Sequence, residues 1–405
     1  MSLDGPQVAA LASGSMQDPA PFLAKLRRES PVCWLPGFDG WLVTSHADVQ
    51  LLFADPRITT DPRIYDAYQA PTEPGAEKWL SELPFRSHPS DPETLGRRLV
   101  SAALTPRAIV RIEDRIHEVV ERFAAPLRGR HGVVDLFGEF TEPVTARVLG
   151  RILGVTAKAA DEDRFLKLAR NATRILRPII SDRKRRETEA AMVEICEHVL
   201  ELVERRRLDP RIGLISDLVE ASHGSTPASA EDIVKVVAGL VSVGTGTTNV
   251  AAVRGLRALL MNPDQLDLLR DDPSLLPDAV SELLRYDNGI VLMTRYVDAD
   301  FELRGQSLRR GQLVLLCVLG ANRDPAVFDD PEQLDLRRDT KEALTFGRGP
   351  HFCIGANIAR AELRLMIAAA LEFLPPGARL LEDQIRWTQK GLLSQLKTLP
   401  VDFGS

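Results

Sequence analysis

The 405-residue chain is poor in cysteine and has no excess of positive charge. Its four cysteines, Cys33, Cys196, Cys317 and Cys353, lie far apart and form no Cys-x-x-Cys pair, so neither a disulfide framework nor a zinc finger is expected. This spacing favours a reducing, cytoplasmic environment. The net charge of −6 gives no overall basic field for a phosphate backbone, so nucleic acid is not an expected partner.

Long hydrophobic runs are also missing. The longest, Leu313 to Ala321, covers about nine residues, far fewer than the roughly 20 that span a bilayer. Met1 to Gln17 shows no basic start followed by an apolar stretch, so no secretory signal or membrane anchor is predicted. Pro56 to Pro92 is rich in Pro, Ser, Glu and Asp, which predicts a long irregular connection. With no internal repeat and no clear linker, 1–405 is interpreted as a single domain.

Helical periodicity dominates the middle of the chain. Four stretches alternate apolar and charged residues at helical spacing: Arg97 to Leu127, Pro143 to Leu153, Ala160 to Ile180 and Arg183 to Leu208. A helix of about 30 residues is predicted from the capping box Ser229-x-x-Asp232 to Met261-Asn262-Pro263. Short strands are predicted at Trp41 to Thr44, Arg295 to Val297, Phe301 to Leu303 and from Leu313, and helix resumes at Ala356. The expected fold is therefore mainly α with small β-sheets.

One loop concentrates glycine, histidine and cysteine. Residues 346–355 have the sequence Phe-Gly-Arg-Gly-Pro-His-Phe-Cys-Ile-Gly and stand directly before a helical pattern. Gly349 and Gly355 lack a Cβ, so we expect backbone conformations closed to other residues and room for a flat ligand. The N-terminus of the following helix is expected to lower the pKa of the Cys353 thiol and favour the thiolate. A lone cysteine is otherwise most often a small buried hydrophobic residue.

The spacing Phe-x-x-Gly-x-His-x-Cys-x-Gly resembles the haem-binding signature of the cytochrome P-450 family. This resemblance implies haem b (iron protoporphyrin IX) as cofactor and one fold with the haem between the long central helix and the helix after the cysteine. It also implies that Cys353 is the proximal iron ligand, that Phe346 packs beneath the haem, and that His351 reaches a propionate. A thiolate ligand favours cleavage of the O–O bond, the property of an oxidant.

Further segments resemble the same family. Glu282-Leu-Leu-Arg285 looks like its Glu-x-x-Arg pair, with Arg338 as the third member and Arg337 as the competitor. Arg97 and Arg295 stand where relatives place guanidinium groups against the propionates. Many relatives have a propionate-binding histidine where this chain has Glu93, so we expect Arg97, Arg295 and His351 together to suffice.

The long helix departs from the family pattern. Residues 243–248, Val-Gly-Thr-Gly-Thr-Thr, correspond to the oxygen-binding segment, in which Thr247 matches the alcohol and Gly246 stands in place of Asp or Glu. Gly244 and Gly246 each cost roughly 1 kcal/mol in a helix, which suggests a groove over the haem. Oxygen activation consumes protons, so Thr245, Thr247, ordered water or a substrate group must replace the missing acid.

The family resemblance also implies a substrate pocket and partners. The predicted pocket lining is mostly apolar, which suits a small hydrophobic organic molecule without choosing among chemical classes: Leu240, Val243, Ile290, Val291, Met293 and Leu392. No flavin or iron–sulfur segment is visible, so a ferredoxin and its reductase are expected to deliver electrons. Five arginines form either a basic docking patch or a scatter of solvated residues: Arg97, Arg98, Arg107, Arg360 and Arg364.

The leading hypothesis is a monomeric, cytoplasmic monooxygenase of bacterial type that uses O2 to hydroxylate or epoxidise a substrate of secondary metabolism. Two alternatives stay open. The first is a haem-thiolate enzyme with atypical chemistry, such as peroxide-driven oxidation, coupling or rearrangement, because the acid is replaced by Gly246. The second is a haem-binding protein without turnover.

Overall fold

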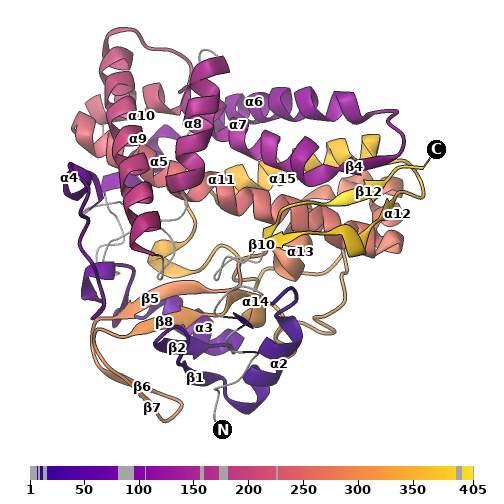
Figure 1. The fold of residues 1–405 in the computed structure, drawn as a ribbon, viewed down its shortest axis with the longest axis horizontal. Helices are drawn as coiled ribbons and strands as arrows, with labels where there is room; N and C mark the ends of the chain where they lie inside the picture. Colours follow the sequence, from indigo (N-terminus) through magenta and orange to yellow (C-terminus); the bar gives the residue numbers. More distant parts are fainter. Residues whose placement is uncertain are drawn as a thin grey trace.

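A computed structural model shows a helical assembly with a sheet at one end (Figure 1). It describes residues 7, 10–11, 16–80, 95–104, 106–155, 159–172, 181–224, 227–388 and 395–404. The predicted mainly α architecture with small β-sheets is confirmed. The described helices are α2 (Ala20–Glu29), α3 (His46–Ala54), α4 (Ala76–Leu80), α5 (Leu95–Ala103), α6 (Pro106–Ala124), α7 (Glu142–Leu153), α8 (Ala159–Ala172), α9 (Asp182–Leu208), α10 (Leu214–His223), α11 (Ala230–Met261), α12 (Pro263–Asp271), α13 (Leu276–Asp287), α14 (Val318–Ala321) and α15 (Ala356–Phe373).

The strands form small sheets that join distant parts of the chain. They are β1 (Val32–Leu35), β2 (Gly40–Val43), β3 (Ile58–Thr59), β4 (Val133–Asp135), β5 (Met293–Val297), β6 (Phe301–Leu303), β7 (Gln306–Leu308), β8 (Leu313–Leu316), β9 (Arg379–Leu380), β10 (Trp387–Thr388), β11 (Gln395–Leu396) and β12 (Pro400–Asp402). The largest sheet has the order β1-β2-β8-β5-β3, with β2 and β8 parallel. A second sheet, β4-β12-β9, brings the C-terminal strand beside the middle of the chain (Figure 1).

Helix α11 runs through the helical part and packs against α9, α7, α13, α8, α15 and α5. It begins at the predicted capping box, in which Asp232 N donates to Ser229 Oγ and Ser229 N donates to Asp232 Oδ2. It ends at Met261, directly before Asn262 and Pro263, as predicted. Among the described residues it alone is long and apolar enough to cross a membrane, yet 72% of its most apolar window is buried inside the protein. Both the burial and the contacts are those of a central core helix.

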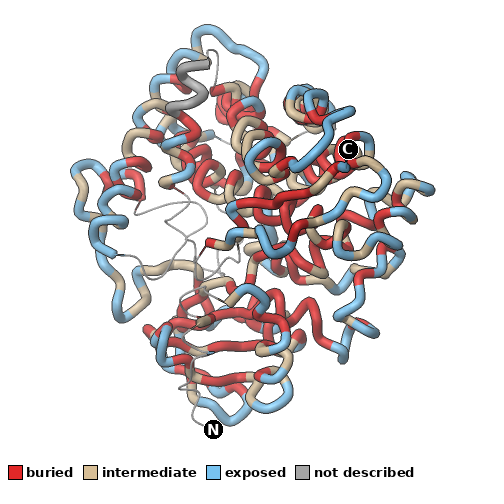
Figure 2. Tube along the Cα trace, turned by 45° about the vertical axis from the view of Figure 1, so that its right-hand side comes forward, coloured by how far each residue is buried: buried red, intermediate tan, exposed pale blue. Residues whose placement is uncertain are grey.

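Buried residues form one large cluster among the helices and two smaller clusters around the sheet, with exposed residues along the outer turns (Figure 2). Strand β8 is buried at all four positions, because it lies in the middle of the sheet with strands on both sides. Its carboxyl end leads into α14, which contacts α2 and α3. The apolar run expected as one strand from Leu313 is therefore split between β8 and α14.

The stretch from Arg97 to Leu127 is helical as predicted, but it is divided into α5, α6 and a 3-10 turn, because a proline at position 106 cannot continue the preceding helix. The expectation of an irregular connection from Pro56 was wrong. The connection from Pro56 contains β3 and the helix α4, in which Trp79 and Leu80 are buried. Tertiary contact with α9 stabilises α4, which is too short to be stable alone.

Candidate functional site

The cysteine loop is a tight structure that places Cys353 directly before α15. Cys353 N donates to Phe346 O at 2.9 Å, which closes the loop. Gly349 has a φ of +68°, and a Cβ there would lie 3.1 Å from Ala54 Cβ, so both conformation and space favour glycine. Gly355 is different from our expectation: its φ is −89°, which any residue adopts, and a Cβ there would meet no atom within 4 Å. Gly355 therefore borders open space beside the loop.

Cys353 differs from the other three cysteines, because it is exposed whereas Cys33, Cys196 and Cys317 are buried. Desolvation raises the pKa of its thiol, and this effect outweighs the N–H of Gly355 and the charges of Arg97 and Arg360, all of which lower it. The N–H of Gly355 at the helix terminus lowers this pKa as expected, but desolvation of the sulfur has the larger effect. A bound metal ion would supply the missing positive charge.

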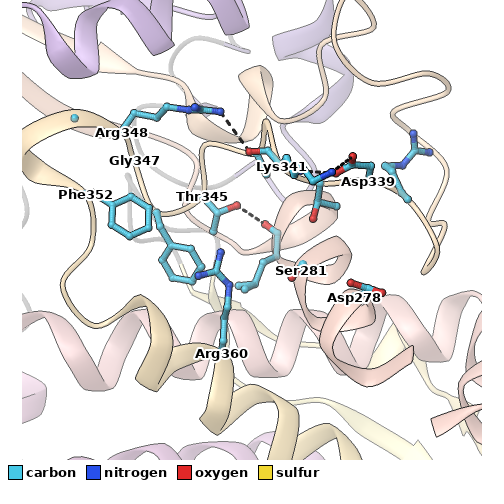
Figure 3. A pocket seen from close by; sticks show the side chains of 15 residues that line it. Asp278, Ser281, Asp339, Lys341, Thr345, Gly347, Arg348, Phe352 and Arg360 are labelled. Carbon is cyan, nitrogen blue, oxygen red and sulfur yellow. Dashed lines mark hydrogen bonds and ion pairs between the residues drawn. The ribbon is translucent and has the colours of Figure 1, made fainter. Parts of the chain in front are cut away.

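Aromatic and cationic side chains flank this loop. The Arg360 guanidinium carbon lies 4.4 Å from the centre of the Phe346 ring, and the Phe346 and Phe352 rings are 6.4 Å apart. Figure 3 shows Phe352 and Arg360 at a pocket of about 550 Å³ beside the loop. Arg97 Nη2 donates to Phe352 O at 2.8 Å, so α5 supports the residue that precedes the cysteine. Phe346 thus makes a cation–π contact with Arg360 of α15.

Arg295 is a buried cation with an unusual environment. It is 8% exposed, and its Nη1 donates to Thr294 O at 2.8 Å. Its guanidinium carbon lies 5.2 Å from the ring of Phe53, and burial lowers its pKa to about 10. Within the described part of the chain no carboxylate pairs with it. A buried guanidinium without an acidic partner is well suited to an anionic ligand.

Glu282 joins two arginines in a buried network. Arg285 Nε lies 2.6 Å from Glu282 Oε2, and both side chains are completely buried. Arg338 Nε lies 3.3 Å from Glu282 Oε1, whereas Arg337 is exposed, so Arg338 is the third member. Arg285 also donates to Asn322 O at 2.9 Å. The network therefore fixes α13 against the segment that leads to the cysteine loop.

Two further residues hold that segment, and the sequence analysis did not identify them. Asn322 Oδ1 accepts from Leu344 N at 2.6 Å, and Asn322 Nδ2 donates to Thr345 Oγ1 at 2.9 Å. Thr345 in turn donates to Leu284 O at 2.9 Å, on α13 (Figure 3). In the sequence these residues are marked only by their neighbours. Asn322 stands before Arg-Asp-Pro, and Thr345 stands before Phe346. Their role depends on contacts between segments more than 20 positions apart.

Helix α11 carries one accessible stripe on an otherwise buried surface. Between Val236 and Leu256 the half-buried residues recur at helical spacing: Leu240, Val243, Gly244, Gly246 and Thr247. Thr247 Oγ1 donates to Val243 O at 2.6 Å, and Thr245 is buried. The missing Cβ of Gly244 points at Leu149, 3.4 Å away, so close packing against α7 is one reason for this glycine.

The predicted substrate-pocket residues differ in how far they are buried. Ile290 and Met293 are half-buried, like Leu240 and Val243. Val291 is 2% exposed and packs into the core cluster beside the sheet, so its side chain adds no accessible surface. Leu392 lies outside the described residues. The accessible members come from α11 and from the segment that enters β5.

Comparison with known proteins decides the family. The family model described as cytochrome P-450 matches residues 66–374. This chain is a cytochrome P-450. It is 32% identical to the vitamin D(3) 25-hydroxylase of Pseudonocardia autotrophica, over all of this chain and 98% of that protein. It is 28% identical to the epothilone C/D epoxidase of Sorangium cellulosum, over 90% and 88% of the two chains. The crystal structure of CalO2 superposes with a TM-score of 0.87 at 30% identity, covering 97% and 98%.

The cytochrome P-450 is therefore a haem-dependent monooxygenase, and its cofactor is iron protoporphyrin IX. The residues present fit this group. The exposed thiol of Cys353 is a suitable iron ligand, the open space at Gly355 leaves room for a flat ring, and the unpaired charge of Arg295 suits a carboxylate. The alternative of a haem-binding protein without turnover is set aside, because the chain belongs to a family whose named relatives are hydroxylases and epoxidases.

Proposed function

We propose that this cytochrome P-450 hydroxylates or epoxidises an apolar organic molecule of secondary metabolism. The observation that carries the proposal is the accessible stripe of α11, whose members are apolar except at Thr247, together with the exposed thiol at the start of α15. Helices α11 and α15 contact each other, so the stripe and the cysteine loop belong to neighbouring elements. We further propose that the protein acts in the cytoplasm, as a monomer.

The proposed roles of the site residues follow from their chemistry. Cys353 would bind the haem iron, and Arg295, Arg97 and His351 would bind the propionates. When bound, a thiolate-ligated haem supplies the oxidising chemistry. Thr247 would hold a proton near the oxygen site, Gly246 would leave space beside it, and Thr245 packs behind them. Phe346 supports the sulfur from below, and Glu282, Arg285 and Arg338 fix the loop.

The substrate is proposed to be a bulky, mainly apolar compound. The named relatives act on vitamin D(3) and on epothilones, by hydroxylation and epoxidation respectively. Leu240, Val243, Ile290 and Met293 offer the apolar, half-buried surface that such a compound needs. Because these four side chains offer no hydrogen-bonding N–H or O–H group, shape would select the substrate more than hydrogen bonding would.

An external ferredoxin, reduced by its reductase, is the proposed electron donor. The pocket beside the cysteine loop has four cationic side chains, Arg338, Lys341, Arg348 and Arg360, against the acids Asp278 and Asp339 (Figure 3). Glu282, Asp339 and Glu342 pair with the first three, whereas Arg360 has no carboxylate partner among the described residues. An acidic protein would complement this unpaired charge.

A second reaction mode is favoured by one observation, the glycine at position 246 on the accessible stripe. Without an acid there, proton delivery to O2 would be slow, and hydrogen peroxide, which brings its own protons and electrons, would bypass the difficulty. The second candidate is therefore peroxide-driven oxidation of the same substrate.

The deciding experiment begins with the reduced protein and carbon monoxide, for the wild type and Cys353→Ala. A strongly red-shifted Soret band that is lost in Cys353→Ala supports the ligand assignment, and its absence from haem-loaded wild type would refute it. Turnover of a panel of apolar polyketides and sterols is then compared with ferredoxin, reductase and NADPH or with peroxide alone. Product formation only with peroxide would favour the second mode.

A further inference from the structure

The C-terminal end of helix α13 is a junction at which three consecutive residues each bind a different part of the chain. Tyr286 O accepts from Arg323 Nη2 at 2.7 Å. Asp287 Oδ1 lies 2.6 Å from Arg254 Nε on α11, and both side chains are buried. Asn288 is the third residue and is 1% exposed. A buried amide is costly unless its N–H and C=O groups are bonded, so the partners of Asn288 show what it holds.

The side-chain amide of Asn288 forms hydrogen bonds in three directions. Its Nδ2 donates to Leu284 O at 2.7 Å and to Thr345 Oγ1 at 3.4 Å. Its Oδ1 accepts from Ile290 N at 2.7 Å. The amide cannot be turned around, because Leu284 O can only accept and the N–H of Ile290 can only donate. Its partners therefore hold Asn288 in a single orientation.

These bonds connect the proposed pocket with the cysteine loop. Ile290 is half-buried and apolar, and it lies in the segment that leads into β5. Thr345 stands directly before Phe346, where the loop begins, and its hydroxyl also accepts from Asn322 Nδ2 at 2.9 Å. One buried amide thus joins a wall of the proposed pocket to the loop that carries Cys353.

The chain reverses its direction between Asn288 and Ile290. Gly289 has a φ of +72°, in the left-handed region that favours glycine. The bond from Ile290 N to the side chain of Asn288 closes this turn, as asparagine often does two residues before its partner. Strand β5 begins at Met293, soon after the turn, and pairs with β8. The amide therefore fixes how the chain enters the sheet and which apolar surface Ile290 presents.

We propose that Asn288 is a positioning residue that fixes the segment from Ile290 to Met293 against the cysteine loop, and so determines which apolar molecules fit beside the haem iron. The proposal rests on the proposed function, which assigns Ile290 and Met293 to the pocket. Asn288 is too deeply buried to meet a substrate, so it acts through the backbone of Ile290. The bonds to Leu284 and Thr345 supply the fixed frame against which that backbone is held.

The test uses two iron ligands of different size. Haem-loaded protein is titrated with imidazole and with 4-phenylimidazole, and the shift of the Soret band gives the two dissociation constants. Both ligands bind iron through an imidazole nitrogen, so the ratio of the constants measures how well the protein accepts the additional apolar ring. A general weakening of iron ligation changes both constants alike and leaves the ratio unchanged. The ratio therefore separates a positioning role from a purely structural one.

Asn288→Ala should raise the dissociation constant of 4-phenylimidazole relative to that of imidazole about fivefold, because a loosened wall must be ordered when the ring binds. Asn288→Asp keeps an oxygen for Ile290 N and should stay closer to wild type. The matched control is Asn262→Ala. Asn262 ends α11 as Asn288 ends α13, and its Nδ2 donates to Ala258 O at 2.8 Å. An equal change of the ratio in the two alanine variants would overturn the proposal.

The connection to the cysteine loop is tested by a double-mutant cycle with Thr345→Val, which removes the hydroxyl and keeps the shape. If the two side chains act through one network, the double variant should change the ratio no more than Asn288→Ala alone. Additive effects would refute the connection. Wild type that binds 4-phenylimidazole no better than imidazole would overturn the apolar pocket of the proposed function, and this role with it. Tighter binding of 4-phenylimidazole by wild type, with the same ratio in Asn288→Ala, would overturn this role alone.

Discussion

Arg295 shows how the protein places a charge before its ligand binds. Among the described residues the buried guanidinium has one backbone acceptor and no carboxylate, which is costly unless an anion compensates it. The surrounding sheet holds Arg295 in this unfavourable position, because its strand β5 pairs with β8 on one side and with β3 on the other. Such an environment would suit a cofactor that carries carboxylates.

Arg295→Leu should therefore weaken haem binding. A charge-assisted hydrogen bond is worth about 1.5 to 3 kcal/mol, so haem should leave the protein at least about tenfold faster. The rate is measured by transfer of haem to an excess of a scavenger protein. Arg337→Leu, which changes an exposed arginine outside the network, is the control and should be neutral. Equal haem loss from the two variants would contradict the assignment.

Glu362 on α15 is 5% exposed, and its Oε1 has no hydrogen-bond partner among the described residues, which predicts a pH dependence of stability. Its pKa is raised to about 8 in the folded protein, against about 4.3 for an unfolded glutamate. The folded state then binds more protons than the unfolded state, so this contribution is complete below about pH 4.3 and is lost as pH rises to about 8. Melting temperatures of wild type should fall relative to Glu362→Gln from about pH 5 to about pH 9. A constant difference would show that Glu362 is ionised when folded.

At the scale of elements, α13 is the support of the cysteine loop. Glu282 binds Arg285 on its own helix and Arg338 from the segment after α14, while Thr345 joins that segment back to Leu284. The loop conformation is thus determined by a helix about 70 positions earlier in the chain. Loss of this support should change the iron ligand without touching it.

Glu282→Gln tests this support. The change leaves the completely buried Arg285 without a counterion and should lower the free energy of unfolding by about 3 to 5 kcal/mol. The reduced carbon monoxide complex should also lose part of its red-shifted band. Urea denaturation and that spectrum are compared with Arg338→Gln, whose 12% exposed side chain predicts a smaller loss. Equal effects would mean that the two ion pairs contribute alike.

At the scale of the whole molecule, the cysteine loop divides two environments. Helix α11 and the entry to β5 supply apolar surface, whereas the pocket beside Phe352 carries an excess of cations. The arrangement separates the proposed substrate from the proposed electron donor. Arg360 lies between the two, because it stacks on Phe346 and also influences Cys353.

Arg360→Gln should weaken ferredoxin binding at low salt by about fivefold and reduce its dependence on ionic strength. The control is Arg379→Gln, because Arg379 lies on β9 in the sheet with the C-terminal strand and pairs with Asp402. Binding is followed by calorimetry at several salt concentrations. If both variants respond alike, the effect is one of net charge and the pocket is not the docking site.

The sequence by itself determined the features that depend on short spacing. The cysteine loop, the Glu282 and Arg285 pair and the capping box of α11 are each contained within ten residues, so local geometry fixes them. The long apolar helix and the mainly α class follow from periodicity in the same way.

Only the tertiary structure decided which charges are buried and which partners they have. The choice of Arg338 over Arg337, the burial of Arg295 and Val291, the raised pKa of the Cys353 thiol and the isolation of Glu362 all depend on desolvation by distant segments. One example is β8, which pairs with β2 from the other end of the chain. Burial is a sum over such long-range contacts, and no local pattern contains it.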